Sequence, residues 1–148
     1  MTLNQVVTAL ETIATNHQQI NSFGFGDIWE QNSSGTIYYP QMFVELESTN
    51  ITTRMLNLTF RIYFMDVVKN GEVNENEVLS DQLEIAKDVV AQLQHVDYTW
   101  VFDAENVPMQ DFTENLTDSV SGWYIDVTLE LPYTFDRCAI PQTPQITN

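Results

Sequence analysis

The chain has 148 residues, of which 43% are hydrophobic, and its five basic and 21 acidic residues give a net charge of −16. This length predicts one domain with a single sizeable core. The acidic balance excludes tight binding to free nucleic acid, which needs Lys and Arg to neutralise phosphates, but an acidic wall could still let DNA slide past.

Residues 2–20 carry apolar side chains three and four positions apart. This spacing predicts a helix with one apolar stripe and with Thr2 as its N-cap. Residues 23–27 contain two glycines around an aromatic residue, which predicts a break in regular structure.

A hairpin is predicted next, with short strands at residues 28–30 and 36–39 on either side of a turn rich in Asn, Ser and Gly. A further strand is expected at residues 42–46. The polar residues 48–53 then predict a connection leading into a long antiparallel strand.

Two stretches with strict alternation organise the rest of the chain, because side chains of a strand alternate between its faces. Residues 57–66 predict a buried face and a wetter face. The buried face is formed by Leu58, Phe60, Ile62 and Phe64, and the wetter one by Thr59, Arg61, Tyr63 and Met65. Residues 123–131 show the same alternation, and their buried face is formed by Trp123, Ile125, Val127, Leu129 and Leu131.

A second helix is predicted from Asn74, which together with Glu77 has the spacing of a capping box, to about His95. Its stripe is expected at Leu79, Leu83, Ala86, Val90 and Leu93, widened by Val78, Ile85, Val89 and Val96. A short strand is expected at residues 98–102. Residues 112–120 should then pair with the last strand in a hairpin around a turn at residues 121–122.

This element order predicts an α+β fold with two layers. A mainly antiparallel sheet, made of a meander and a C-terminal hairpin, would carry two amphipathic helices on one face. We expect one domain over residues 1–135 and an extended tail over residues 136–148.

Few residues could support catalysis. His17 and His95 are each expected near a helix end, in a surface or capping role, and no ligand spacing joins either to a second metal ligand. Asp126 and Glu130, with Glu114 and Asp118 on the neighbouring strand, could in principle hold a divalent cation. A solvated or subunit-facing surface is the simpler interpretation of these four carboxylates.

The remaining signals also argue against an enzyme. Cys138 has no neighbouring histidine to activate it, only Arg137, and a single cysteine excludes an internal disulfide. We find no phosphate-binding or nucleophile-elbow motif, so no cofactor is expected. We also expect no secretory signal and no membrane span.

Aromatic residues and arginines are enriched at protein–protein contacts. This chain has more aromatic residues than the inner side of a two-layer fold requires, and few basic residues. The predicted subunit-interface residues are Trp29, Arg54, Arg61, Tyr63, Tyr124 and Arg137.

The element order resembles that of the small neck proteins of tailed phages, the tail-completion or tail-terminator family. Residues 25–30 (Phe-Gly-Asp-Ile-Trp-Glu) and 39–44 (Tyr-Pro-Gln-Met-Phe-Val) are also similar to virion proteins of phages that infect Bacteroidetes, crAss-like phages among them. So is the ending 136–141 (Asp-Arg-Cys-Ala-Ile-Pro). The resemblance defines no catalytic residue.

The resemblance implies a non-enzymatic subunit of the virion neck or tail, made in the cytoplasm of the bacterial host. It would form a ring of about six or twelve copies and contact portal, ring or tail proteins, with DNA passing through without sticking. Carboxylates facing the lumen would repel the DNA. The candidates are Asp66, Glu72, Glu75, Glu77, Asp103 and Glu105.

Two alternatives remain open. A small intracellular binding module would enclose an apolar pocket for a ligand or peptide, lined by Phe60, Phe64, Trp123 and Leu129. A metal-dependent hydrolase would use Asp126 and Glu130 as its carboxylate pair.

Overall fold

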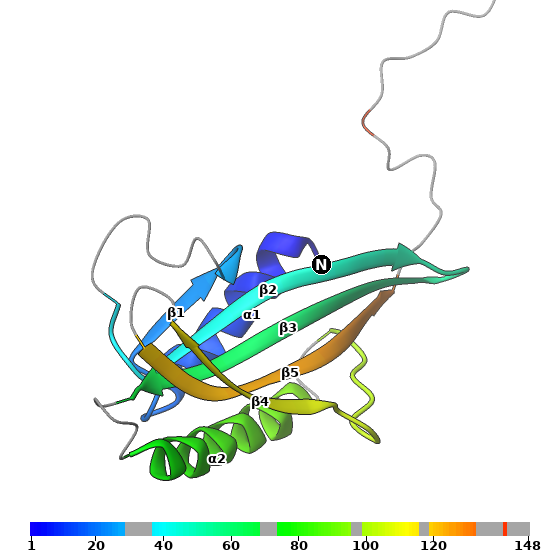
Figure 1. Ribbon diagram of the computed structural model, residues 1–148. Helices are drawn as coiled ribbons and strands as arrows, with labels where there is room; N and C mark the ends of the chain where they lie inside the picture. The colour runs from blue at the N-terminus through cyan, green and yellow to red at the C-terminus, as the bar shows by residue number, and fades with distance from the viewer. Residues whose placement is uncertain (29–36, 69–73, 96–98, 116–118, 133–140, 142–148) are drawn as a thin grey trace, which may run out of the picture.

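Two helices and five strands form the fold in the computed structural model, which describes residues 1–28, 37–68, 74–95, 99–115, 119–132 and 141. In chain order the elements are α1 (Leu3–Asn16), β1 (Ser22–Phe25), β2 (Gln41–Ile51), β3 (Met55–Val67), α2 (Glu75–Leu93), β4 (Met109–Asn115) and β5 (Ser119–Pro132). The strands form one sheet in the order β1-β2-β3-β5-β4, and both helices lie on one side of it (Figure 1). The predicted two-layer α+β class is therefore confirmed, with a mixed, mostly antiparallel sheet.

The two alternating stretches lie at the centre of the sheet. β3 and β5 pair antiparallel without interruption from Met55 opposite Pro132 to Val67 opposite Val120. The predicted inner residues are buried on the helix side, except for Trp123, which is partly buried. The buried ones form the main core together with the apolar side chains of the helices. Removal of these aliphatic and aromatic side chains from water supplies most of the stabilisation of such a layer.

Met65 departs from the predicted pattern. The alternation correctly places it on the face away from the helices, yet it is fully buried there. It packs in a second small cluster with Ile28, Phe43 and Val120. The prediction of a wet environment is wrong because the far face has an apolar cluster of its own.

The β2–β3 hairpin is longer than predicted. β2 continues to Ile51, which pairs with Leu56, so most of the expected connection at residues 48–53 is strand. A backbone hydrogen bond of 2.9 Å from Thr52 N–H to the Met55 carbonyl closes the turn. Residues with polar, exposed side chains can belong to a strand when backbone hydrogen bonds to the neighbouring strand hold them. The polarity of residues 48–53 therefore predicted a connection where the chain forms a strand.

β1 was not predicted at all. It runs parallel to β2, where Gly24 lies opposite Phe43. A Cβ atom on Gly24 would lie 2.5 Å from Cδ2 of that phenylalanine, and Gly26 has a positive φ of 143°. The two glycines thus serve a close approach and a turn at the end of a strand, which corrects the predicted break over residues 23–27.

α1 follows its prediction at the start. The Thr2 side chain accepts a hydrogen bond from the Gln5 N–H, and the Gln5 side chain accepts one from the Thr2 N–H, so a complete capping box begins the helix. The helix ends at Asn16, with His17 as its C-cap, and not at residue 20. Ile20 is still buried, but from the segment that follows the helix.

α2 begins where predicted and ends two residues before the predicted His95, but its capping and part of its buried stripe differ from the prediction. Asn74 is the N-cap but makes no capping hydrogen bond with its side chain, so the predicted capping box is wrong. The helix ends at Leu93, whose carbonyl accepts a 3.0 Å hydrogen bond from the Trp100 indole. The buried residues are Val78, Gln82, Ile85, Ala86, Val89 and Leu93, whereas Leu79, Leu83 and Val90 are only partly buried.

The C-terminal hairpin turns earlier than predicted. Phe112 lies opposite Gly122, and Asn115 lies opposite Ser119, so residues 121–122 lie within β5 and do not form the turn. A Cβ atom on Gly122 would lie 1.8 Å from the Phe64 carbonyl oxygen, so the close approach of β3 requires glycine. Of the strand predicted at residues 98–102, the described residues 99–102 form one bridge, between Val101 and Glu130.

Two predicted features cannot be compared. The hairpin at residues 28–39 falls mostly outside the described residues. The tail over residues 136–148 also lies outside them, except for Pro141.

Candidate functional site

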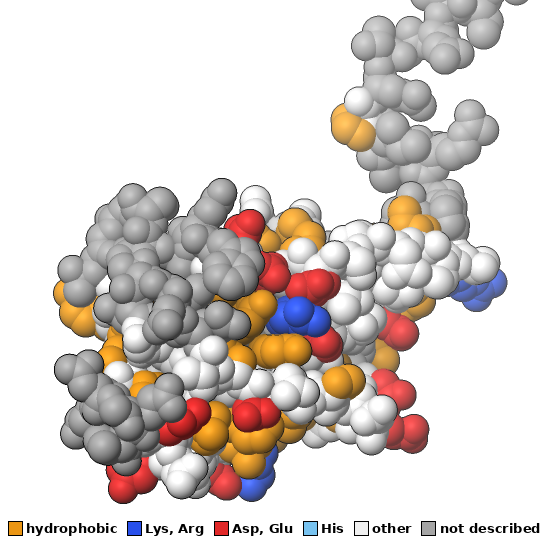
Figure 2. Space-filling view, in the orientation of Figure 1, with side chains coloured by type: hydrophobic (Ala, Val, Ile, Leu, Met, Phe, Trp, Pro, Cys, Tyr) orange, Lys and Arg blue, Asp and Glu red, His pale blue; other side chains and the backbone are white. Residues whose placement is uncertain are grey.

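The face of the sheet away from the helices carries a group of polar and aromatic side chains, here called the open-face cluster: Glu45, Glu47, Arg61, Tyr63, Phe112, Tyr124 and Asp126. Cross-strand pairing assembles it, because Glu45 lies opposite Arg61 on β3, which in turn lies opposite Asp126 on β5. Figure 2 shows basic, acidic and hydrophobic side chains gathered over the middle of the sheet.

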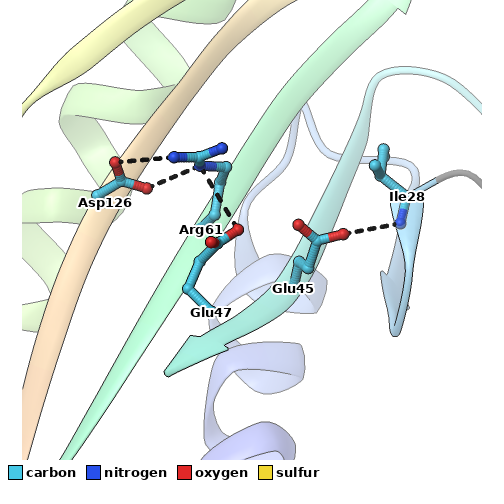
Figure 3. A network of polar contacts seen from close by, with 5 residues as sticks. All are labelled: Ile28, Glu45, Glu47, Arg61 and Asp126. Carbon is cyan, nitrogen blue, oxygen red and sulfur yellow. Dashed lines mark hydrogen bonds and ion pairs between the residues drawn. The ribbon is translucent and has the colours of Figure 1, made fainter. Parts of the chain in front are cut away.

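Arg61 is the centre of this cluster (Figure 3). Its Nε donates to Asp126 Oδ1 at 2.9 Å, and its Nη2 donates to Oδ2 at 3.4 Å. A third carboxylate oxygen, Oε1 of Glu47, lies 3.7 Å from Nε. The hydrogen bond to Asp126 raises the pKa of the guanidinium above its usual value, so Arg61 remains charged.

The Tyr124 ring covers the guanidinium, and further aromatic rings continue along the face. Arg61 Cζ lies 4.5 Å from the centroid of the Tyr124 ring, a cation–π distance. Tyr63 contacts Phe112 edge to face, with centroids 5.6 Å apart, and lies 5.7 Å from Tyr124. Burial first, and the nearby Glu45 carboxylate second, raise the pKa of Tyr63, so its hydroxyl remains a neutral donor and acceptor.

The cluster carries excess negative charge. Asp126 and Glu47 contact the one guanidinium, and Glu45, opposite Arg61 in register, adds a third carboxylate. The Glu45 Oε2 atom accepts a 3.1 Å hydrogen bond from the Ile28 N–H (Figure 3). Burial first, and a hydrogen bond with Glu45 second, raise the pKa of Glu47. The side chains of Arg61, Asp126 and Glu47 are each about one-third exposed, at 31%, 31% and 33%. The cluster can therefore contact another molecule through polar and aromatic groups together.

Three of the six predicted interface residues lie together in this cluster: Arg61, Tyr63 and Tyr124. Arg54 lies away from them, in the turn between β2 and β3, and its side chain is exposed. Trp29 and Arg137 lie outside the described residues.

The predicted acidic group is divided. Asp66 lies on β3 opposite Ser121, with Glu75 and Glu77 in the first turn of α2. Asp103 and Glu105 follow Val101, which bridges to Glu130. Ser121 and Glu130 are about 30 Å apart along β5 at 3.3 Å per residue, so these carboxylates do not form one continuous surface. Glu72 lies outside the described residues.

The carboxylate pair suggested for metal chemistry does not form. Asp126 and Glu130 are separated by about 13 Å along β5, too far to share one cation, and Asp126 binds Arg61 instead. The side chains of Glu114 and Asp118 lie outside the described part of the structure. Within the described ranges, no group of three or more His, Cys, Asp or Glu side chains could hold a metal ion.

The histidines differ in their surroundings. His17 Nδ1 accepts the Gln19 N–H at 3.1 Å, and its Nε2 lies 2.9 Å from Asp88 Oδ2 on α2. His17 thus ends α1 and links the two helices, in agreement with the predicted capping role. His95 is exposed just beyond α2. Cys138 is not among the described residues.

The positions suggested for an apolar ligand pocket are packed. Phe60, Phe64 and Leu129 are fully buried in the main core. The Trp123 indole donates a 2.8 Å hydrogen bond to the Leu79 carbonyl. These four side chains therefore fill space between the sheet and the helices.

A polar pocket that was not predicted lies on the helix side. It has a volume of about 340 Å³, and its lining includes Asp66, Asp81 and Gln82. One signal could have indicated it, because Gln82 occupies a core position of the α2 stripe between Val78 and Ile85. A polar residue at such a position requires a partner.

Comparison of the sequence with family models and with curated proteins finds no match. Among the helices that the structure describes, none combines the length and the apolar character needed to cross a membrane.

Proposed function

We propose that this chain is a structural, non-enzymatic subunit of a tailed-phage virion. It assembles into a ring at the neck or tail, where the head joins the tail or the tail is completed, and DNA passes through the ring. The open-face cluster is a contact surface for a neighbouring subunit or another virion protein. The resemblance described above supports the choice of a phage virion.

The observation that carries the proposal is the convergence of Arg61, Tyr63 and Tyr124 on one open face. A guanidinium held by a carboxylate and an aromatic ring is already oriented, so the arginine loses little side-chain entropy when a partner binds. Aromatic residues and arginine dominate the energetics of protein contacts.

The net negative charge of the chain supports a role in which DNA passes the protein without binding to it. The net charge of −16 opposes adhesion of a polyanion at every point of a ring. Carboxylates occur at both ends of the sheet, so more than one face of the subunit could repel passing DNA.

Replacement of Tyr124 by serine tests the contact surface. We expect Tyr124→Ser to weaken self-association, or binding to a neighbouring virion protein, at least tenfold in sedimentation velocity. Tyr38→Ser is the matched control, because Tyr38 is 66% exposed and lies outside the cluster. Equal association of both variants and the wild-type chain, with circular dichroism confirming that all are folded, would refute the assignment of this face.

A further inference from the structure

A polar pocket lies where residues 18–21, which follow α1, meet the end of β3 and the middle of α2. We call it the Gln82 pocket. Its volume is about 340 Å³, and its polar lining residues are Gln18, Gln19, Asn21, Asp66, Asp81 and Gln82. It is on the helix side of the sheet and is separate from the open-face cluster.

The side-chain amide of Gln82 indicates that the pocket binds a ligand. Its side chain is 1% exposed, and neither its Nε2 nor its Oε1 has a hydrogen-bond partner among the described residues. A buried amide without a partner destabilises a fold, so native proteins rarely retain one unless another group satisfies it. In an α2 stripe that is otherwise apolar, an amide at this position is best explained by a bound group.

The two carboxylates define the chemistry of that group. Asp66 and Asp81 interact closely enough that the charge of Asp81, after the larger effect of burial, raises the pKa of Asp66. The described lining contains no Lys or Arg. Two carboxylates beside an amide oxygen suit a cation with several N–H donors, and a planar guanidinium matches carboxylate geometry best.

Among the described residues, the chain itself offers one such cation. Among the Lys and Arg residues that the structure describes, Arg61 binds Asp126, and Lys87 contacts Glu84 at 3.1 Å. Arg54 has no ion pair within the described residues, and it is exposed in the turn between β2 and β3.

Geometry excludes the same copy as the source of the guanidinium. Arg54 and Asp66 lie at opposite ends of β3, about 40 Å apart at 3.3 Å per residue. Arg54 can therefore reach a Gln82 pocket only on another molecule. Two copies could exchange this contact reciprocally in a two-fold dimer, or copies could repeat it head to tail; the head-to-tail arrangement closes a ring when the rotation permits, and it is the one that the proposed function requires.

We infer that the Gln82 pocket of one copy binds the guanidinium of Arg54 from the next copy, so that subunits join end to end. This inference rests on the proposed function, because it supplies the contact that would propagate a ring. It also gives that ring a polarity, with the β2–β3 turn of each subunit directed toward the helix side of its neighbour.

The pocket chemistry is tested with methylguanidinium in the full-length Arg54→Ala chain, whose own arginine cannot compete. We expect a saturable NMR shift of the Gln82 side-chain amide. Affinity should fall at least tenfold when Asp66→Asn and Asp81→Asn are added, but not with Asp103→Asn and Glu105→Gln, which change the charge equally at the other end of the sheet. Absence of a saturable shift in the Arg54→Ala chain overturns the inference.

The source of the guanidinium is tested by mixing variants. Arg54→Ala and the double variant Asp66→Asn/Asp81→Asn should each associate at least tenfold more weakly than the wild-type chain, whereas Lys87→Ala should not. An equimolar mixture of the first two should restore this junction in pairs, because Arg54 of the double variant can enter the intact pocket of Arg54→Ala. Wild-type assembly by Arg54→Ala overturns Arg54 as the occupant, even if the ring itself is real. A wild-type chain that stays monomeric while its pocket binds methylguanidinium overturns the proposed ring and the role of Arg54, but not the guanidinium site.

Discussion

Arg61 Nε and Asp126 Oδ1 lie 2.9 Å apart and join β3 to β5 across the open face. The two residues lie directly opposite each other on neighbouring strands, so they form a cross-strand pair on the open face, as apolar side chains do on the helix side. The aromatic ring of Tyr124 lies over the same guanidinium. One arginine thus ties together a cross-strand ion pair and the aromatic group proposed as a contact surface.

Removal of Arg61 should destabilise the sheet modestly. Arg61→Ala leaves Asp126 and Glu47 without their cation, and we expect a loss of about 1–2 kcal/mol in the free energy of unfolding, measured with urea. Arg61→Lys keeps the charge but loses the two-point hydrogen bond, so its loss should be smaller. Equal stability of Arg61→Ala and the wild-type chain would contradict this account of the pair.

Gly122 should tolerate no side chain. Its added Cβ would lie 1.8 Å from the Phe64 carbonyl oxygen, so Gly122→Ala must displace β3 backbone. We expect a destabilisation of about 2 kcal/mol or more in urea unfolding. Thr128→Ala, at an exposed position of the same strand, should cost less than about 1 kcal/mol, and a similar effect of both variants would argue against the close approach.

The carboxyl group of Asp66 should make stability depend on pH. Its pKa is raised in the folded state, mainly by burial, so the folded chain binds the proton more tightly than the unfolded chain does. Its contribution is therefore fully present below the ordinary value of 3.8 and is lost as pH rises through the raised pKa. At pH 7, Asp66→Asn should therefore unfold at a higher temperature than the wild-type chain. The gain in the free energy of unfolding should be at most about 1 kcal/mol, because solvent screens a partly exposed carboxylate.

The difference between Asp66→Asn and the wild-type chain should shrink as pH falls toward 4, in thermal melts followed by circular dichroism. Glu11→Gln, which removes an exposed carboxylate on α1, serves as the control and should show no such trend. A lower melting temperature for Asp66→Asn at pH 7 would show that the carboxylate stabilises the fold instead.

Gln82→Leu should stabilise the isolated subunit. The substitution keeps the volume but removes two buried polar atoms without described partners, which is worth about 1–2 kcal/mol. Gln92→Leu, at an exposed position of α2, should change stability by less than about 0.5 kcal/mol in urea unfolding. Destabilisation by Gln82→Leu would show that the amide is satisfied within the subunit.

The fold was predictable where local periodicity and tertiary burial agree. The alternation in β3 and β5 identifies the two central strands because both have one face in the main core. β1 escaped prediction, since it is only four residues long and its side chains show no alternation between a buried and an exposed face. The turn of the last hairpin was misplaced because Gly122 serves a close approach between strands and not a change of direction.

The site was predictable to the same degree. Arg61 and Tyr63 lie two residues apart and therefore share a face of β3. The register of β3 with β5 places Tyr124 opposite Tyr63 on that same face. The Gln82 pocket depends on the contact of α2 with the end of β3 and with the segment after α1, which no local pattern encodes. The acidic candidates were grouped by their positions in loops, and the sheet separates them because its central strands are long.

The central claim is that copies of this chain assemble through heterologous contacts into a closed ring. Native mass spectrometry of the purified full-length chain, with electron microscopy of the same sample, tests it most directly. We expect one oligomer of defined size and annular particles with an open centre. A monomer that persists at the highest attainable concentration, with no annular particles on the grid, would contradict the account.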